Sequence, residues 1–192
     1  MTALVKSISL MSMKQKLLAI SGTLIIILLA IIGFQQYRLF QTKQYSPEAS
    51  VQYVSSDVRI EVSYNRPSKK GRIIFGDLVP YGEWWRTGAN EPTTITLSRD
   101  IIFNESDVLA AGQYSIVTIP HKDHWKLIFN NVIPNWGTKY DPSQNALEID
   151  MQLENLPQVV EQFLIDFVDA NEQAELIMAW DNVKVSVPFR VL

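Results

Sequence analysis

Apolar and polar side chains alternate in VRIEVSY, residues 58–64 of a 192-residue chain. A period of two puts the apolar side chains on one face of a β-strand and the polar side chains on the other. The pattern returns in later short runs bounded by Gly, Pro, Asn and Asp, which are typical of turns. The runs in which we expect further strands are residues 94–97, 101–103, 113–119, 125–129, 147–153, 163–168, 174–180 and 183–191.

These runs predict an all-β domain over residues 51–192. Short strands without alternating helices favour an antiparallel β-sandwich or a related barrel. A parallel sheet would need crossover helices, and only residues 156–162 suggest a short helix. We expect turns at Asn171-Glu172 and at Asp181-Asn182 to separate the last three strands.

A charge-free apolar run, LLAISGTLIIILLAIIGF, occupies residues 17–34. At about 1.5 Å per residue, this run as a helix approaches the roughly 30 Å of a bilayer core. It predicts either a transmembrane anchor or a cleaved secretory signal, although no small-residue cleavage site follows it. Residues 1–16 are then a cytoplasmic N-terminus and residues 35–50 a polar juxtamembrane linker. Translation could begin at Met1, Met11 or Met13.

The charges are divided unevenly along the chain. The first 40 residues carry four basic and no acidic side chains, whereas residues 41–192 carry 13 basic and 20 acidic ones, a balance of −7. Positive charge before the apolar run keeps the N-terminus in the cytoplasm, so we expect the domain in the periplasm or outside the cell, and secreted if the run is cleaved. This export and the negative domain argue against nucleic-acid binding.

The absence of cysteine from the whole sequence excludes several chemistries. A disulfide scaffold, a thiol nucleophile and a Cys-ligated zinc site all require that residue. No G-x-S-x-G motif marks a serine nucleophile, and we expect no cofactor.

The stretch YNRPSKKGRIIFGDLVPYGEWWRTGANEPTT, residues 64–94, mostly lacks the alternation of a strand. Long loops rich in side chains that stack and form hydrogen bonds are typical places for recognition. We therefore expect the binding surface of the domain in this loop.

Four strings in this order resemble the bacterial exported family called domain of unknown function 2911. They are YNRPSKKGRIIFG (64–76), LVPYGEWWRTGANEPTTI (78–95), LAAGQYSIVTIP (109–120) and NWG (135–137), within a resemblance over about residues 51–192. The resemblance supplies no catalytic residues. It implies a family motif that includes Arg66, Lys70, Gly71, Arg72, Gly76, Pro80, Tyr81, Gly82, Trp85, Arg86, Thr87, Gly88, Asn90, Glu91 and Thr94.

The WWRTGANE segment has two interpretations. In one, Arg86 and Glu91 form a paired network that satisfies the backbone of a covering loop. In the other, this segment forms a contact surface for a polar ligand or a partner. The residues of that expected surface are Trp84, Trp85, Arg86, Asn90 and Glu91.

A local basic cluster precedes this segment and contains Arg66, Lys69, Lys70 and Arg72. Such cations bind phosphate, sulfated glycans or lipid headgroups through charge-assisted hydrogen bonds. The alternative is a solvated turn.

Two further groups are weak candidates for chemistry. Glu83 and Glu91 flank a tryptophan pair and could act as the two carboxylates of an envelope glycoside hydrolase, one of them with a raised pKa. His121, Asp123 and His124 could contact a metal ion, although the resembling family commonly has Gly and Glu where the two histidines stand. The alternative for this second group is a surface turn between two strands.

The sequence thus favours a membrane-anchored, extracytoplasmic, non-catalytic module that acts through residues 64–94. Its partner would be a protein of a membrane complex or an envelope glycan. A glycoside hydrolase and a purely structural domain remain the alternatives.

Overall fold

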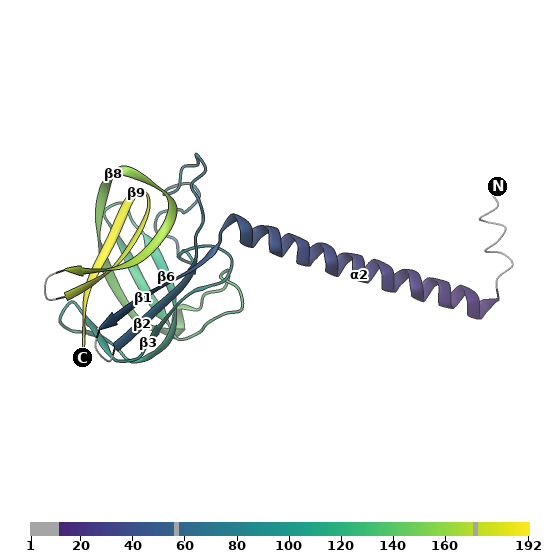
Figure 1. Ribbon diagram of the computed structural model, residues 1–192, viewed down its shortest axis with the longest axis horizontal. Coiled ribbons are helices and arrows are strands. Elements are labelled where there is room, and N and C mark those ends of the chain that lie inside the picture. Colours follow the sequence, from purple (N-terminus) through teal and green to yellow (C-terminus); the bar gives the residue numbers. More distant parts are fainter. Residues whose placement is uncertain (1–11, 56–57, 171–172) are drawn as a thin grey trace. The chain divides into compact units, whose positions relative to one another are not determined.

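The computed structural model describes residues 12–55, 58–170 and 173–192. The chain divides into two compact units, Met1–Thr42 and Lys43–Leu192. The first unit consists mainly of a helix, and the second contains all the strands. Figure 1 shows both units.

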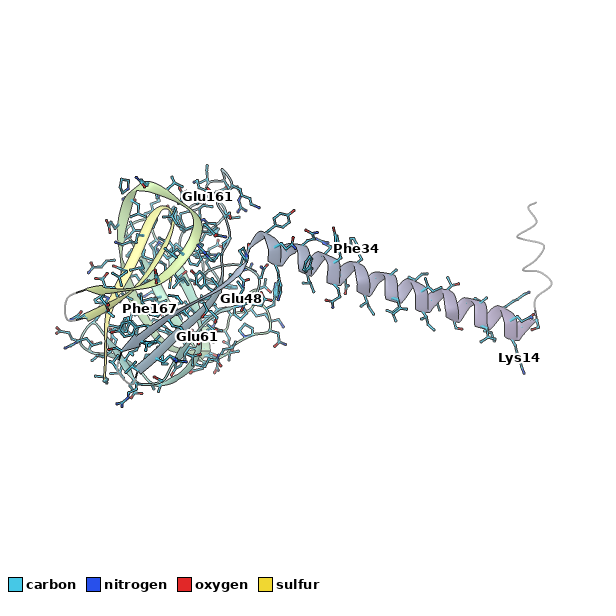
Figure 2. All side chains as sticks on the ribbon, in the orientation of Figure 1. Lys14, Phe34, Glu48, Glu61, Glu161 and Phe167 are labelled. Carbon is cyan, nitrogen blue, oxygen red and sulfur yellow. The ribbon has the colours of Figure 1, made fainter. Side chains whose placement is uncertain are left out.

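Helix α2 (Met13–Tyr45) has 33 residues and no buried side chain. A capping box begins it, because the Ser12 hydroxyl accepts the backbone N–H of Gln15 while the Gln15 side chain accepts that of Ser12. Figure 2 shows its side chains, Lys14 and Phe34 among them, projecting outward. By length and composition α2 can cross a membrane, which fits a membrane anchor or a signal sequence. The segment 35–50, predicted as a linker, is helical as far as Tyr45.

Within the described residues, nine strands form one sheet in which every neighbouring pair is antiparallel. Their order is β1-β2-β3-β6-β7-β8-β9-β4-β5. The strands are β1 (Glu48–Ser55), β2 (Val58–Asn65), β3 (Thr93–Leu97), β4 (Ile101–Phe103), β5 (Asp107–Leu109), β6 (Gly112–Pro120), β7 (His124–Asn130), β8 (Asn145–Ala170) and β9 (Gln173–Val191).

The sheet curls around a single apolar core. Strand β8 bends strongly (Figure 1), and its register with β9 shifts between Asn155 and Leu164. Tyr53 of β1 contacts the rings of Phe167 and Phe189 at 5.9 and 5.5 Å between centroids, which brings the first strand against β8 and β9. These contacts are consistent with a sandwich or a barrel.

The all-β class and the N-terminal apolar helix are confirmed. The helix expected at residues 156–162 is wrong, because β8 continues through them. Pro157 and the β-branched pair Val159-Val160 favour extended backbone there.

Two further details differ from the expectation. Residues 174–180 and 183–191 belong to one strand, β9, in which Asp181 has a positive φ of 57° rather than forming a chain-reversing turn. The expected turn at Asn171-Glu172 lies outside the described residues. Strands β1 and β5 were not predicted.

Candidate functional site

Three segments that are distant in the sequence meet beside the start of β1. The backbone N–H of Gly137, in the loop after β7, donates to the carbonyl of Asn90 at 3.0 Å. The side-chain amide of Asn90, just before β3, donates to the carbonyl of Ser46 at 3.3 Å. These bonds join the 131–141 loop, the 84–92 segment and the beginning of the domain.

The 84–92 segment is held in shape by backbone pairing and buried hydroxyls. Trp85 exchanges two backbone hydrogen bonds with Thr118 of β6, at 2.7 and 3.0 Å. The Thr93 hydroxyl then donates to the carbonyl of Thr87 at 2.6 Å. At Gly88, with a φ of 147°, an added Cβ would stand 2.9 Å from the carbonyl oxygen of Asn65, so only glycine fits.

The two adjacent tryptophans have different environments. The Trp85 ring packs in the core, stacked on Trp180 at 5.8 Å with 17° between the planes. It also meets Phe163 at 5.0 Å. Trp84 is 40% exposed, and its ring lies 5.4 Å from that of Tyr140 in the 131–141 loop. Trp84 is therefore available for contacts, whereas Trp85 is part of the core.

Glu91 lies in a network that includes a cation. Its carboxylate is 2.5 Å from Nζ of Lys43 and accepts a 3.2 Å hydrogen bond from the Asn65 amide. Burial acts to raise the pKa of Glu91, but the hydrogen bonds from Lys43, from its own backbone and from Asn65 outweigh that effect and lower it. The partner of Glu91 is thus Lys43 rather than the expected Arg86.

Arg86 is half-buried, and its guanidinium makes no hydrogen bond or ion pair within the described residues. Its stem packs on the 131–141 loop, where a Cβ added to Gly137 would stand 3.0 Å from Cδ of Arg86. Burial lowers the pKa of the Arg86 guanidinium, which still remains protonated at neutral pH. A partly desolvated cation without a partner attracts an anion.

A hollow of about 530 Å³ opens in the same loop. This volume falls in the range of roughly 300–1,000 Å³ typical of ligand sites. The lining residues are Ser115, Asn130, Val132, Ile133, Pro134, Asn135, Trp136, Lys139, Tyr140 and Asp141.

Some polar groups of this hollow already have partners in the fold. The Asn130 side chain bonds to the backbone of Asp141 and Val132, and the Ser115 hydroxyl donates to the carbonyl of Val132. By contrast, Trp136 has no ring contact and Lys139 no ion pair within the described residues. The hollow thus offers an indole face and an ammonium group to a ligand.

The basic cluster forms a turn that we call the basic turn, residues 66–72. Nε of Arg66 donates to the carbonyl of Phe163, and Lys69 forms an ion pair with Asp181. Arg72 donates to the carbonyls of Ser68 and Lys69 at 2.5 and 3.0 Å.

Lys70 differs from the other cations of the basic turn, because its Nζ lies over the Tyr45 ring, 4.5 Å from the centroid. Lys70 and Gly71 both have positive φ, and the N–H of Arg72 bonds to the carbonyl of Lys69, which is the geometry of a type I′ turn. Within the described residues these cations form no hydrogen bond or ion pair with Glu91, whose partners are Asn65 and Lys43.

The histidine pair lies in the turn between β6 and β7. The rings of His121 and His124 stack with 4.6 Å between centroids, and Nδ1 of His124 is 2.8 Å from a carboxylate oxygen of Asp123. The hydrogen bond from His124 lowers the pKa of Asp123. Among the described residues, no group of three or more His, Cys, Asp or Glu side chains could hold a metal ion.

The expected carboxylate pair, Glu83 and Glu91, does not line the hollow as the two carboxylates of a hydrolase would line its cleft. Glu83 is exposed, and the described residues that line the hollow include neither Glu83 nor Glu91. A general acid needs a raised pKa, whereas that of Glu91 is lowered.

The residues of the hollow were not singled out from the sequence. The signal was present in Asn135-Trp136-Gly137, which belongs to the strings that carry the family resemblance. What the sequence did not indicate is that this tripeptide meets the 84–92 segment, nor that Lys139 and Tyr140 lie beside it.

A family model described as "Protein of unknown function (DUF2911)" matches residues 46–189. Neither the curated proteins nor the solved structures contain a match.

Proposed function

Because the chain belongs to the DUF2911 family, whose description gives no activity, we propose a function from its own side chains. The protein is a membrane-anchored module that binds an acidic, sugar-like component of the cell envelope. The body of the ligand lies in the hollow, and its acidic group reaches Arg86, which does not line the hollow but packs against Gly137 of the same loop. It acts by binding and not by catalysis.

The unpartnered guanidinium of Arg86 is the observation that carries this proposal. An arginine that is half-buried loses part of its hydration, and folding here returns no hydrogen bond within the described residues. A carboxylate or phosphate would supply that bond, because its oxygens match the planar fork of the guanidinium. Lys139, in the adjoining loop, adds a second cation for the same ligand.

Aromatic rings support a sugar as the body of the ligand. Trp136 lines the hollow, and Trp84 packs on Tyr140 at its edge. Flat rings offer an apolar face to the C–H groups of a sugar, while neighbouring amides such as that of Asn135 bond its hydroxyls.

The N-terminal segment, as far as the end of α2, supports an envelope location. Helix α2 is long and apolar enough to serve as an anchor, and the basic residues before the apolar run favour a cytoplasmic N-terminus. A domain held in this way meets envelope glycans and membrane proteins alike.

Native mass spectrometry of the full chain, released gently from its own membranes, tests the proposal. We expect the intact chain to carry a small bound mass that Arg86→Ala removes and Arg59→Ala, an exposed arginine on β2, retains. In a titration followed by tryptophan fluorescence, a uronic-acid disaccharide should bind at least tenfold more tightly than its neutral counterpart, since a charge-assisted hydrogen bond contributes about 1.5–3 kcal/mol.

Other outcomes would overturn the proposal in distinguishable ways. A second protein chain bound in place of the small mass would indicate an accessory subunit. Equal binding of the acidic and neutral disaccharides would show that Arg86 does not recognise the acidic group of the ligand. A fall of many degrees in the melting temperature of Arg86→Ala would instead make Arg86 structural.

A further inference from the structure

An apolar patch lies exposed on the loop that follows the basic turn. Ile73, Leu78 and Tyr81 are 67%, 45% and 39% exposed. They are neighbours, because the N–H of Leu78 bonds to the carbonyl of Ile73 and the Tyr81 ring lies against Gly76. Burying such side chains in an apolar environment is favourable, so contact with an apolar surface would stabilise them.

Two cations border this patch, which together with them we call the loop patch. Lys70 and Lys122 are exposed, and Lys122 lies over the Tyr81 ring, 5.9 Å from its centroid. Glu161, labelled in Figure 2, accepts the backbone N–H of Lys70. Neither lysine has an ion-pair partner within the described residues, and the exposed carboxylates of Asp77 and Asp123 lie in the same two loops.

One residue of the loop patch, Lys70, adjoins the point at which the chain enters the domain. Lys70 contacts Tyr45, the last residue of α2, and both residues belong to the second compact unit. Only residues 35–42 separate this unit from the end of the apolar run. As a helix they span about 12 Å, compared with about 5–8 Å for one headgroup layer beside the roughly 30 Å hydrocarbon core. The loop patch is thus tethered within reach of the bilayer.

We propose that the loop patch docks on the anionic headgroups of the leaflet that this tether faces. Ile73, Leu78 and Tyr81 enter the interface, and Lys70 and Lys122 bind lipid phosphates. The proposal rests on the anchor in the proposed function and is independent of the ligand in the hollow. Docking would hold the domain close to the membrane surface instead of leaving it to swing on its tether.

The absence of cysteine makes a site-specific test direct, since one introduced cysteine is the only labelling site. The full chain with Leu78→Cys, carrying an apolar spin label, is reconstituted in phosphatidylcholine vesicles with or without 30% phosphatidylglycerol. Val168→Cys on β8 is the control, because these side chains are 45% and 44% exposed. Accessibility to oxygen, which enters lipid, is compared with accessibility to a water-soluble nickel chelate.

We expect the label at position 78 to show a severalfold higher oxygen-to-nickel ratio in the anionic vesicles only, and the label at position 168 to show no change. Lys70→Glu with Lys122→Glu should return position 78 to its value in neutral vesicles, because each lost cation weakens docking about fivefold. Arg59→Glu with Arg190→Glu, exposed elsewhere, makes the same charge change and should not. Raising the salt from 0.1 to 1 M should release the wild-type loop patch without any substitution.

Flotation of the chain with both kinds of vesicle reports the anchor separately. If the chain floats while position 78 is as accessible to nickel as position 168, the docking proposal is overturned and the anchor stands. Equal lipid contact in neutral and anionic vesicles would show that docking does not depend on anionic headgroups, and this outcome would overturn the proposal. If the chain does not float, the anchor itself fails.

Discussion

The basic turn and the segment around Arg86 both present arginines in a glycine-rich loop, but the structure uses them in opposite ways. Arg66 and Arg72 donate to backbone carbonyls and hold the turn together. Arg86 has no partner within the described residues. The comparison teaches that the hydrogen bonds a cation already makes, and not its membership of a cluster, separate the arginines with a structural role from the one that we propose binds a ligand.

The largest expected effect belongs to the basic turn. Lys69→Met removes the cation that faces Asp181, both side chains being at most 20% exposed, and leaves a carboxylate without a partner. We expect the free energy of unfolding to fall by about 2–3 kcal/mol. Urea unfolding followed by tryptophan fluorescence measures it, and all five tryptophans lie in the domain.

A second substitution tests the cause of that loss. Asp181→Asn added to Lys69→Met removes the unpaired charge, and asparagine tolerates the positive φ of this position. The double variant should be more stable than Lys69→Met alone. If it is not, the ion pair contributes little and the basic turn is held by its other bonds.

A matched pair of arginine substitutions sharpens the comparison. Arg72→Ala removes two hydrogen bonds to carbonyls and should lower the free energy of unfolding by about 1 kcal/mol. Arg86→Ala removes none within the described residues and should change it by less than about 0.5 kcal/mol. The same urea titration measures both variants. Equal losses would show that Arg86 is structural as well.

The last prediction concerns Glu91 and acid. Because the folded pKa of Glu91 lies below the ordinary value of 4.5, its carboxylate stabilises the folded chain above that value. The contribution is lost as the pH falls through the lowered folded pKa. Lys43 and Glu91 are 55% and 35% exposed, so we expect less than about 1 kcal/mol.

Glu91→Gln measures this contribution directly. The difference in unfolding free energy between wild type and variant should be largest at neutral pH and should shrink below pH 4.5. A difference that does not change with pH would mean that Glu91 acts through its shape and not through its charge.

Much of the fold could be read from local pattern. Alternation in residues 58–64 and in the later runs correctly predicted most strands. Successive side chains of a strand point to opposite faces of the sheet, so a strand with one buried face alternates apolar and polar residues. The errors arose where the pattern is ambiguous: residues 156–162 mix apolar and polar side chains, yet β8 bends through them. Asp181 resembled a turn but occupies an irregular position inside β9.

The site was predictable only in part. The sequence directed attention to Trp84, Trp85 and Arg86, but it could not say that Trp85 packs in the core and Trp84 against Tyr140. Adjacent residues of an extended segment point to opposite sides, and the direction of each depends on which side faces the core. The prediction that these residues contact a ligand awaits the experiments above.

By itself, the sequence determined the all-β class, the apolar helix and the family, since each depends on local periodicity, length or an ordered motif. Only the tertiary structure decided that Glu91 pairs with Lys43, that Asn90 bonds Gly137 and that Arg86 is without a partner within the described residues. The reason is physical: a hydrogen bond is made between groups brought together by the curl of the sheet, and residues 90 and 137 are adjacent only after folding.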